Sequence, residues 1–161
     1  WWRDRFAEAP EKWPVGNPIL SELASWDAEV SGLGGLVDGW EALLANTPPR
    51  IADFEAYREG RASGWIVLAD HLGSKADKRA IALASARWSM ADAAASMSES
   101  EARELARREG LALPNAPHLP RDLRALTVLE TIGRRALESG AAPLSRPGDL
   151  LSVLRRGLTG R

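Results

Sequence analysis

Two pairs of acidic residues have the spacing that a cation site on a helix would need. The members of each pair stand four positions apart: Asp4 with Glu8, and Glu55 with Glu59. That spacing places both carboxylates on one helix face, and carboxylate oxygens are the ligands that hard cations such as Mg²⁺ prefer. Arginines follow in both stretches, a pattern typical of a solvated helix face. We interpret both pairs as surface charges and assign no metal ligand.

The chain offers little for thiol or histidine chemistry. It has no Cys, which excludes disulfides, thiol catalysis and Cys-ligated zinc, and its only His residues are His71 and His118. His71 stands near an expected helix C-terminus, where dipole and packing roles suffice. His118 lies in a Pro-rich stretch and is expected to be an exposed turn residue. Neither has a Ser or acidic partner at a recognisable triad spacing.

Three basic pairs could contact anions, and each also has an ordinary surface role. They are Arg107-Arg108, Arg134-Arg135 and Arg155-Arg156. We interpret the first two as solvated helix faces or partners of helix C-terminal dipoles. The third could bind a phosphate, although a basic pair alone is a weak signal.

The elements that must position these residues are helices. Good helix formers dominate the 161 residues, whereas Val and Ile are sparse and Tyr57 is the only Tyr. Lys and Arg number 21 against 22 Asp and Glu, which gives no electrostatic case for nucleic acid. No run of about 18 apolar residues is present, so no transmembrane segment is expected. The composition predicts one all-α domain over residues 1–161 and fits a cytoplasmic protein.

Pro and Gly positions divide the chain into expected helices. The first, at residues 1–9, has the pattern of the end of a helix and starts at Trp1 without an initiator Met. We therefore expect further helices upstream of Trp1. A loop then covers 10–18, and irregular stretches cover 110–120 and 140–147. Further helices are predicted at 19–26, 27–44, 51–72, 98–109, 121–138 and 149–156. A long Ala-rich helix that begins at Asp77 or Ser74 is predicted to run to residue 97.

Three local details of these helices are also predicted. Asp27 is expected to cap the helix predicted at 27–44. The apolar face of that helix is expected to consist of Val30, Leu33, Leu36, Val37, Trp40, Leu43 and Leu44. Ser98 to Glu101 offers capping-box chemistry. Gly60 and Gly64, four apart inside one helix, indicate either a kink or a tight contact between helices.

Several stretches resemble the squalene/phytoene synthase family. Trp1-Trp2-Arg3-Asp4 and Asn17-Pro18-Ile19-Leu20 resemble the family's Trp-Trp/Arg-Asp helix and the His-Pro-Val-x-x-Leu start of its next helix, with Asn17 in place of His. Asp53 to Gly64 resembles its Tyr-x-x-Ala-Gly-x-Val-Gly helix, in which Tyr57 and Gly64 match while Gly60 and Arg61 depart. Leu119 to Leu126 and Arg134 to Leu137 resemble its C-terminal helices. The resemblance implies an all-α bundle like the C-terminal part of the isoprenoid synthase fold.

That resemblance also implies a chemistry, which this chain matches only in part. The family joins two prenyl diphosphates head to head, with Mg²⁺ bridging the diphosphate to two Asp-x-x-x-Asp motifs. The second motif should fall in the stretch from Ala84 to Ala95. There Trp88 replaces Gln, Ala91 replaces Asn, and Ala94-Ala95 replaces Arg-Asp, while Asp92 is a lone carboxylate out of register. We therefore expect no catalytic or metal-binding residue in this chain, and Mg²⁺ only if an upstream part carries an aspartate-rich motif.

The seven Trp residues admit two interpretations. They can fill the core, as large aromatic residues commonly do. Trp65 and Trp88 could instead form an aromatic wall around a prenyl chain or a carbocation. The candidate residues of such a substrate cavity are Tyr57, Gly60, Gly64, Trp65, Trp88 and Asp92.

Two functions remain open from the sequence. The first is a catalytically degenerate relative of the family that binds a prenyl diphosphate or another lipid-like ligand, or that acts in assembly with a protein partner. The alternative is an active prenyltransferase of the squalene/phytoene synthase type whose metal site is supplied upstream. The resemblance implies both, and Ala94-Ala95 favours the first.

Overall fold

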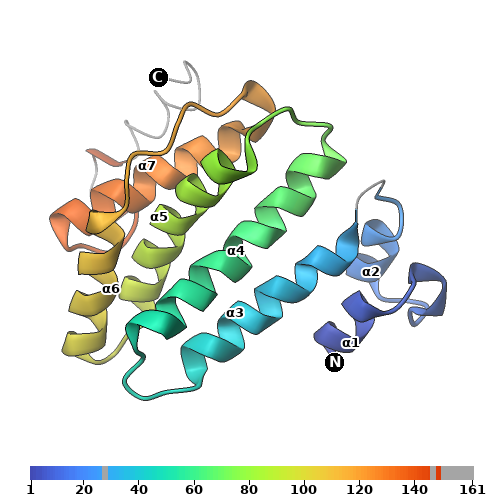
Figure 1. Cartoon of the computed structure of the whole chain (residues 1–161), viewed down its shortest axis with the longest axis horizontal. Helices are drawn as coiled ribbons and strands as arrows, with labels where there is room; N and C mark the ends of the chain where they lie inside the picture. The colour runs from blue at the N-terminus through green and yellow to red at the C-terminus, as the bar shows by residue number, and fades with distance from the viewer. Residues whose placement is uncertain (27–28, 146–147, 150–161) are drawn as a thin grey trace.

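The computed structural model describes residues 1–26, 29–145 and 148–149, and these residues form helices and no strand (Figure 1). The predicted all-α class is confirmed. The α-helices are α1 (Trp2–Ala7), α2 (Pro18–Leu23), α3 (Gly34–Leu44), α4 (Ile51–His71), α5 (Lys78–Ser96), α6 (Ser100–Ala112) and α7 (Arg124–Ser139). Short 3₁₀ turns occupy Pro10–Lys12, Val30–Leu33 and Arg121–Leu123. None of the helices in this part of the chain is long and apolar enough to cross a bilayer.

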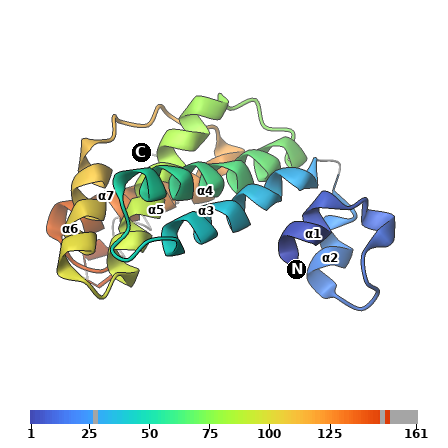
Figure 2. The same cartoon turned by 60° about the horizontal axis from the view of Figure 1, so that its bottom comes forward.

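Helices α3, α4, α5 and α7 run side by side, and the shorter helices lie at the two ends of this layer. Helices α1 and α2 pack at one end and α6 at the other, an arrangement that both views show (Figure 1, Figure 2). The core consists of three clusters. One gathers Phe54, Tyr57, Met90 and Leu137, the second joins α1 and α2 to Val67, and the third includes Ile81 and Leu126. Helix α4 contributes to all three clusters.

Helices α3 and α4 cross at glycines, which resolves the two alternatives for Gly60 and Gly64. A methyl group at Gly60 would collide with the Gly35 carbonyl oxygen and would lie 3.0 Å from the Gly39 Cα atom. A methyl group at Gly64 would lie 2.9 Å from a terminal carbon of Leu36. At Gly60 the two backbones approach so closely that only glycine fits, whereas at Gly64 the neighbour is the end of a side chain. Of the two alternatives, these glycines therefore provide the tight contact between α3 and α4.

Two helix beginnings match the sequence because a polar side chain caps them. Asn17 Oδ1 accepts hydrogen bonds from the backbone N–H groups of Ile19 and Leu20, so α2 begins at Pro18. Asp77 Oδ1 accepts one from Arg79 at 2.6 Å and begins α5. Helix α4, predicted at 51–72, spans Ile51–His71.

Other local predictions were wrong. The helix predicted at 27–44 begins only at Gly34, after a 3₁₀ turn, and Asp27 lies outside the described residues. Most of its predicted apolar face is nevertheless buried or partly buried, including Val30, Leu33 and Leu43. Two members of that face are not: Leu44 is 74 % exposed and Trp40 39 %. Helix α6 begins at Ser100 without a side-chain cap, so no capping box forms at Ser98 to Glu101.

The C-terminal boundaries also differ from prediction. Helix α6 continues past Gly110 to Ala112, because Gly110 packs against Leu137 and Met90, where a methyl group would lie 2.8 Å and 2.9 Å from their side-chain carbons. The helix predicted at 121–138 begins as a 3₁₀ turn and continues as α7. Its end is confirmed to within one residue: α7 ends at Ser139, before Gly140 at φ 66°. The helix predicted at 149–156 falls almost entirely outside the described residues.

Candidate functional site

The structure brings three of the singled-out side chains together between α4 and α5. Tyr57 is fully buried, and its hydroxyl donates a hydrogen bond of 3.2 Å to Asp92 Oδ2. The Arg61 guanidinium lies 3.9 Å from the same oxygen and 6.0 Å from the centre of the Tyr57 ring. Burial raises the pKa of the Tyr57 phenol above its usual value, and the nearby Arg61 lowers it in part. The Asp92 carboxylate is therefore already engaged by a hydrogen bond from Tyr57 and by the charge of Arg61.

The other candidate cavity residues take part in helix packing. Gly60 and Gly64 form the α3–α4 crossing described above. Trp65 packs, partly buried, against the third core cluster. Trp88 lies where α5 crosses α7, since a methyl group at Gly133 would be 2.8 Å from the Trp88 Cα atom. These side chains are thus spread along α4 and α5.

The acidic pairs and the histidines have surface or packing roles. Glu8 pairs with Arg5 at 3.0 Å and Glu55 with Arg58 at 3.5 Å, as expected for solvated helix faces. His71 ends α4 and stacks on Trp26, with ring centres 4.4 Å apart and planes 9° apart. His118 is exposed, as predicted.

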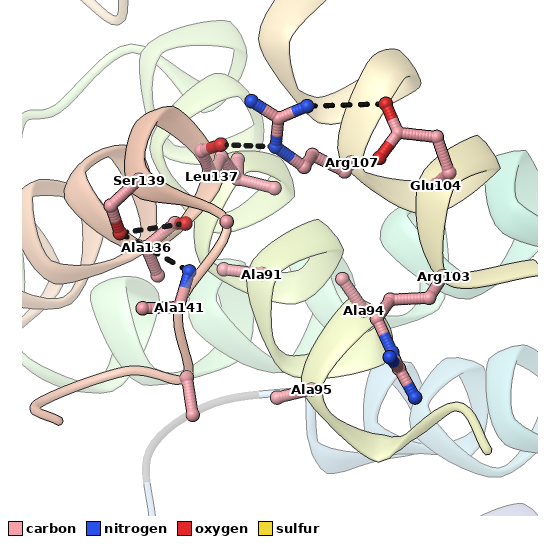
Figure 3. A pocket seen from close by; sticks show the side chains of 12 residues that line it. Ala91, Ala94, Ala95, Arg103, Glu104, Arg107, Ala136, Leu137, Ser139 and Ala141 are labelled. Atoms are coloured by element: carbon pink, nitrogen blue, oxygen red, sulfur yellow. Dashed lines mark hydrogen bonds and ion pairs between the residues drawn. The ribbon is translucent and has the colours of Figure 1, made fainter. Parts of the chain in front are cut away.

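A pocket of about 460 Å³ opens where α5, α6 and α7 converge (Figure 3). Ala91, Ala94 and Ala95 of α5 form one wall, and Ala136 and Leu137 of α7 form another. The turn after α7 completes the pocket with Ser139 to Ala142. None of the six candidate cavity residues lines it. Its volume falls in the range of small-molecule sites, which are roughly 300–1,000 Å³.

Two arginines of α6 bring positive charge to this apolar pocket. Arg107 Nε donates a hydrogen bond of 2.7 Å to the Leu137 carbonyl oxygen, and its Nη1 donates one of 3.1 Å to Glu104 Oε1. Arg103 donates from Nε and Nη2 to the Met97 carbonyl oxygen, at 3.3 Å and 2.9 Å. In Figure 3 Arg107 lies above the alanines and Arg103 beside them.

These contacts hold both arginines at helix ends. The carbonyl oxygens they bind belong to the last turn of α7 and to the residue that ends α5, where backbone acceptors lack partners within the helix. Arg107 Nη2 and Arg103 Nη1 make no hydrogen bond within the described part of the chain. Each arginine therefore keeps one amino group for an anion at the pocket.

The pocket does not have the ligands that magnesium would require. Its α5 wall presents the methyl groups of Ala94 and Ala95 where the family resemblance expects Arg and Asp. Among the described residues that line it, Glu104 is the only one with a carboxylate, and that group is paired with Arg107. Within the described residues, no three acidic, His or Cys side chains gather as a metal-binding group. The described residues that line this pocket therefore do not fit the Mg²⁺ that the resemblance implies.

A buried ion pair beside this site was not predicted from the sequence. Arg87 Nη1 donates to Glu130 Oε1 at 2.7 Å, and Arg87 Nη2 donates to the carbonyl oxygens of Leu113 and Pro114. The two side chains are 6 % and 11 % exposed. The ion pair joins α5 to α7, and the contacts of Arg87 with Leu113 and Pro114 hold the segment that follows α6. The sequence shows both charges but not their distance, since they stand 43 residues apart.

The chain matches no family model, no curated protein and no solved structure. The resemblance to the squalene/phytoene synthases rests on the residues quoted above.

Proposed function

We propose that this chain is a squalene/phytoene synthase-like domain that binds a lipid-like anion, such as a prenyl diphosphate, without turning it over. The observation that carries the proposal is the pocket between α5, α6 and α7, which has alanine walls and arginines at its side. An apolar tail is favoured between the alanines because it leaves water there. An anionic head is favoured at Arg107 or Arg103 because each keeps a free amino group.

The absence of turnover in this proposal rests on the residues of the α5 wall. Departure of a diphosphate requires neutralisation of its negative charge by divalent cations or by several cationic groups. Ala94 and Ala95 supply methyl groups at this wall, and Asp92 is bonded to Tyr57 between α4 and α5. This arrangement supports binding of the ligand over cleavage of its diphosphate.

Calorimetric titration with three ligands tests the proposal. Farnesyl diphosphate carries both head and tail, farnesol only the tail, and inorganic diphosphate only the head. If the pocket recognises both parts, farnesyl diphosphate binds the wild-type chain at least tenfold more tightly than either fragment, about 1.4 kcal/mol or more. Equal binding of farnesyl diphosphate and inorganic diphosphate would instead mean that the alanine walls do not hold the tail.

A matched pair of substitutions locates the site. Ala95 lies at the pocket and Ala125 does not, and both are exposed helical residues. Ala95→Phe fills the pocket entrance and is expected to weaken binding of farnesyl diphosphate about tenfold, whereas Ala125→Phe leaves it unchanged. Equal effects of the two substitutions would place the ligand elsewhere.

The same ligand also tests the alternative of an active prenyltransferase. The wild-type chain is incubated with farnesyl diphosphate and Mg²⁺, and free diphosphate and apolar products are measured. The proposal predicts recovery of intact ligand. Release of diphosphate together with a coupled hydrocarbon would overturn the claim that the ligand is bound without turnover.

A further inference from the structure

We infer that Glu104 is a built-in competitor for the ligand head group: it occupies one of the two amino groups of Arg107 until a more highly charged anion displaces it and binds both. This inference rests on the proposed function and deepens it, because it concerns which head groups the same pocket accepts. Its basis is the position of Glu104, which lines the pocket and also the groove beside it.

The two partners of this ion pair differ in how firmly they are held. Arg107 is anchored by its hydrogen bond to the Leu137 carbonyl oxygen, and its side chain is 31 % exposed. The Glu104 side chain is 66 % exposed, and its pairing with Arg107 is the only contact that restrains its carboxylate in the described part of the chain. Exposed ion pairs of this kind are weak. A ligand anion can therefore bind Arg107 in its present position, and only the Glu104 carboxylate has to move.

The structure also provides a position for the displaced carboxylate. The groove between α6 and the start of α4 is lined by Glu104 together with Arg108 and Arg50. Arg108 follows Glu104 by four residues on α6, a spacing at which oppositely charged side chains meet. Its present partner is the adjacent Glu109, at 3.5 Å. Glu104 can thus exchange Arg107 for Arg108 by a rotation of its own side chain.

This exchange selects among anionic head groups. A carboxylate ligand replaces Glu104 with an equivalent group and gains little, since it carries the same single charge. A phosphate or diphosphate carries more charge and more acceptor oxygens, so it forms stronger charge-assisted hydrogen bonds with Arg107. The expected preference is for amphiphiles with phosphate heads over fatty acids of similar length.

The test compares two substitutions that remove the same charge from α6. Glu104→Gln removes the competitor, whereas Glu101→Gln changes the net charge equally at a residue that lines the groove but not the pocket. In calorimetric titrations at one salt concentration, Glu104→Gln is expected to strengthen binding of farnesyl diphosphate about two- to fivefold. Binding of a fatty acid of similar length should gain at least as much, and farnesol should not respond. Glu101→Gln should leave all three ligands within about twofold of wild type.

A second substitution tests the destination of the carboxylate. Arg108→Gln removes the alternative partner, so it should weaken binding of farnesyl diphosphate in the wild-type chain. In the Glu104→Gln background it should have no effect, because no carboxylate then needs a new partner. An equal loss in both backgrounds would contradict the exchange and indicate a general effect of charge.

The outcomes separate this inference from the proposed function. If farnesyl diphosphate binds and Glu104→Gln changes its affinity no more than Glu101→Gln does, the competitor role is overturned while the lipid-binding function stands. If farnesyl diphosphate binds neither the wild-type chain nor the Glu104→Gln variant, the proposed function fails and this inference fails with it. Binding to the Glu104→Gln variant alone supports the inference in its strongest form.

Discussion

Arg87 shows how much of this structure depends on one buried charge. Its guanidinium binds Glu130 of α7 and two carbonyl oxygens of the segment after α6, so a single side chain joins three parts of the fold. Removing water from a charge is costly, and the cost is recovered only while the partners are in place. Loss of one partner should therefore be more harmful than loss of both.

Substitution at this pair gives a direct test. Arg87→Met leaves Glu130 buried without its partner and should reduce the free energy of unfolding by about 3–5 kcal/mol in urea titrations. Arg87→Met combined with Glu130→Leu should recover a large part of that loss, because no buried charge is left unpaired. A double variant less stable than the single one would show that Glu130 stabilises the fold through contacts other than its ion pair with Arg87.

Tyr57 makes the stability of the fold depend on pH at the alkaline end. Burial raises the pKa of its phenol in the folded chain above the unfolded value of 10.0, so the fold favours the neutral phenol. The unfolded chain then loses a proton that the folded chain keeps, and the free energy of unfolding falls as pH rises above about 10. In Tyr57→Phe this part of the decrease should be absent. The measurement is urea unfolding of both chains between pH 8 and about 11.

Two features make the tyrosine experiment easy to interpret. Tyr57 is the only Tyr of the chain, so phenolate absorbance reports this residue alone. At neutral pH, Tyr57→Phe should cost about 1 kcal/mol for the lost hydrogen bond to Asp92. Identical alkaline slopes for the two chains would mean that Tyr57 ionises as readily when folded as when unfolded.

At the scale of elements, the α3–α4 crossing depends on the absence of side chains. Gly60→Ala introduces a methyl group against the Gly35 carbonyl oxygen, where backbone rather than a flexible side chain must move. Overpacking of this kind should lower the free energy of unfolding by about 1–3 kcal/mol or more. Gly34→Ala is the matched control because a methyl group at Gly34 meets nothing within 4 Å. The control should be neutral or stabilising by up to about 1 kcal/mol, because Ala is the better helix former. Equal losses in the two variants would show that the α3–α4 contact is not the source of the loss.

The sequence predicted helices better than their ends, and residues of α3 and α6 show why. Pro and Gly mark breaks, and capping side chains such as Asp77 mark beginnings, because both act within a few residues. Gly110 is a typical helix-ending residue, but α6 continues through it. Its contacts with Leu137 and Met90 come from distant parts of the chain, so the local sequence does not show them. Leu44 fits the apolar period of α3 but is 74 % exposed, because it is the last residue of that helix and periodicity does not show where the packing partners end.

The pocket was harder to predict than the helices. Its walls are alanines from two helices, and alanine has no chemical signature in a sequence. Arg103 and Arg107 stand four apart on one helix, and that spacing was the one available signal. The sequence favours a solvated helix face or a dipole partner for the basic pair at 107–108. The hydrogen bond from Arg107 to the Leu137 carbonyl oxygen, in the last turn of α7, agrees with the role of dipole partner.

At the scale of the whole molecule, α1 and α2 are attached to the remaining helices mainly through the second core cluster. Val67 of α4 is 5 % exposed and packs against Gly32, where a methyl group would lie 2.8 Å from its Cγ2 atom. Val67→Ala should loosen this end of the molecule locally. Amide hydrogen exchange in α2 is expected to accelerate more than exchange in α5 and α7.

Leu126→Ala serves as the control for this experiment, because Leu126 is fully buried in the third cluster. Its loss should accelerate exchange in α5 and α7 at least as much as in α2. Uniform acceleration throughout the chain by Val67→Ala would contradict a local role for the second cluster.

Helix α4 contributes side chains to all three clusters, and this has a consequence for how the chain folds. Phe54, Val67 and Ala69 belong to different clusters but are fixed to one rigid rod of 21 residues. No cluster can assemble fully before that rod forms, and each cluster that assembles helps to hold the rod for the others. Assembly of the three clusters is thereby linked through α4. Tryptophan fluorescence and far-UV circular dichroism should therefore follow the same sigmoidal curve during unfolding.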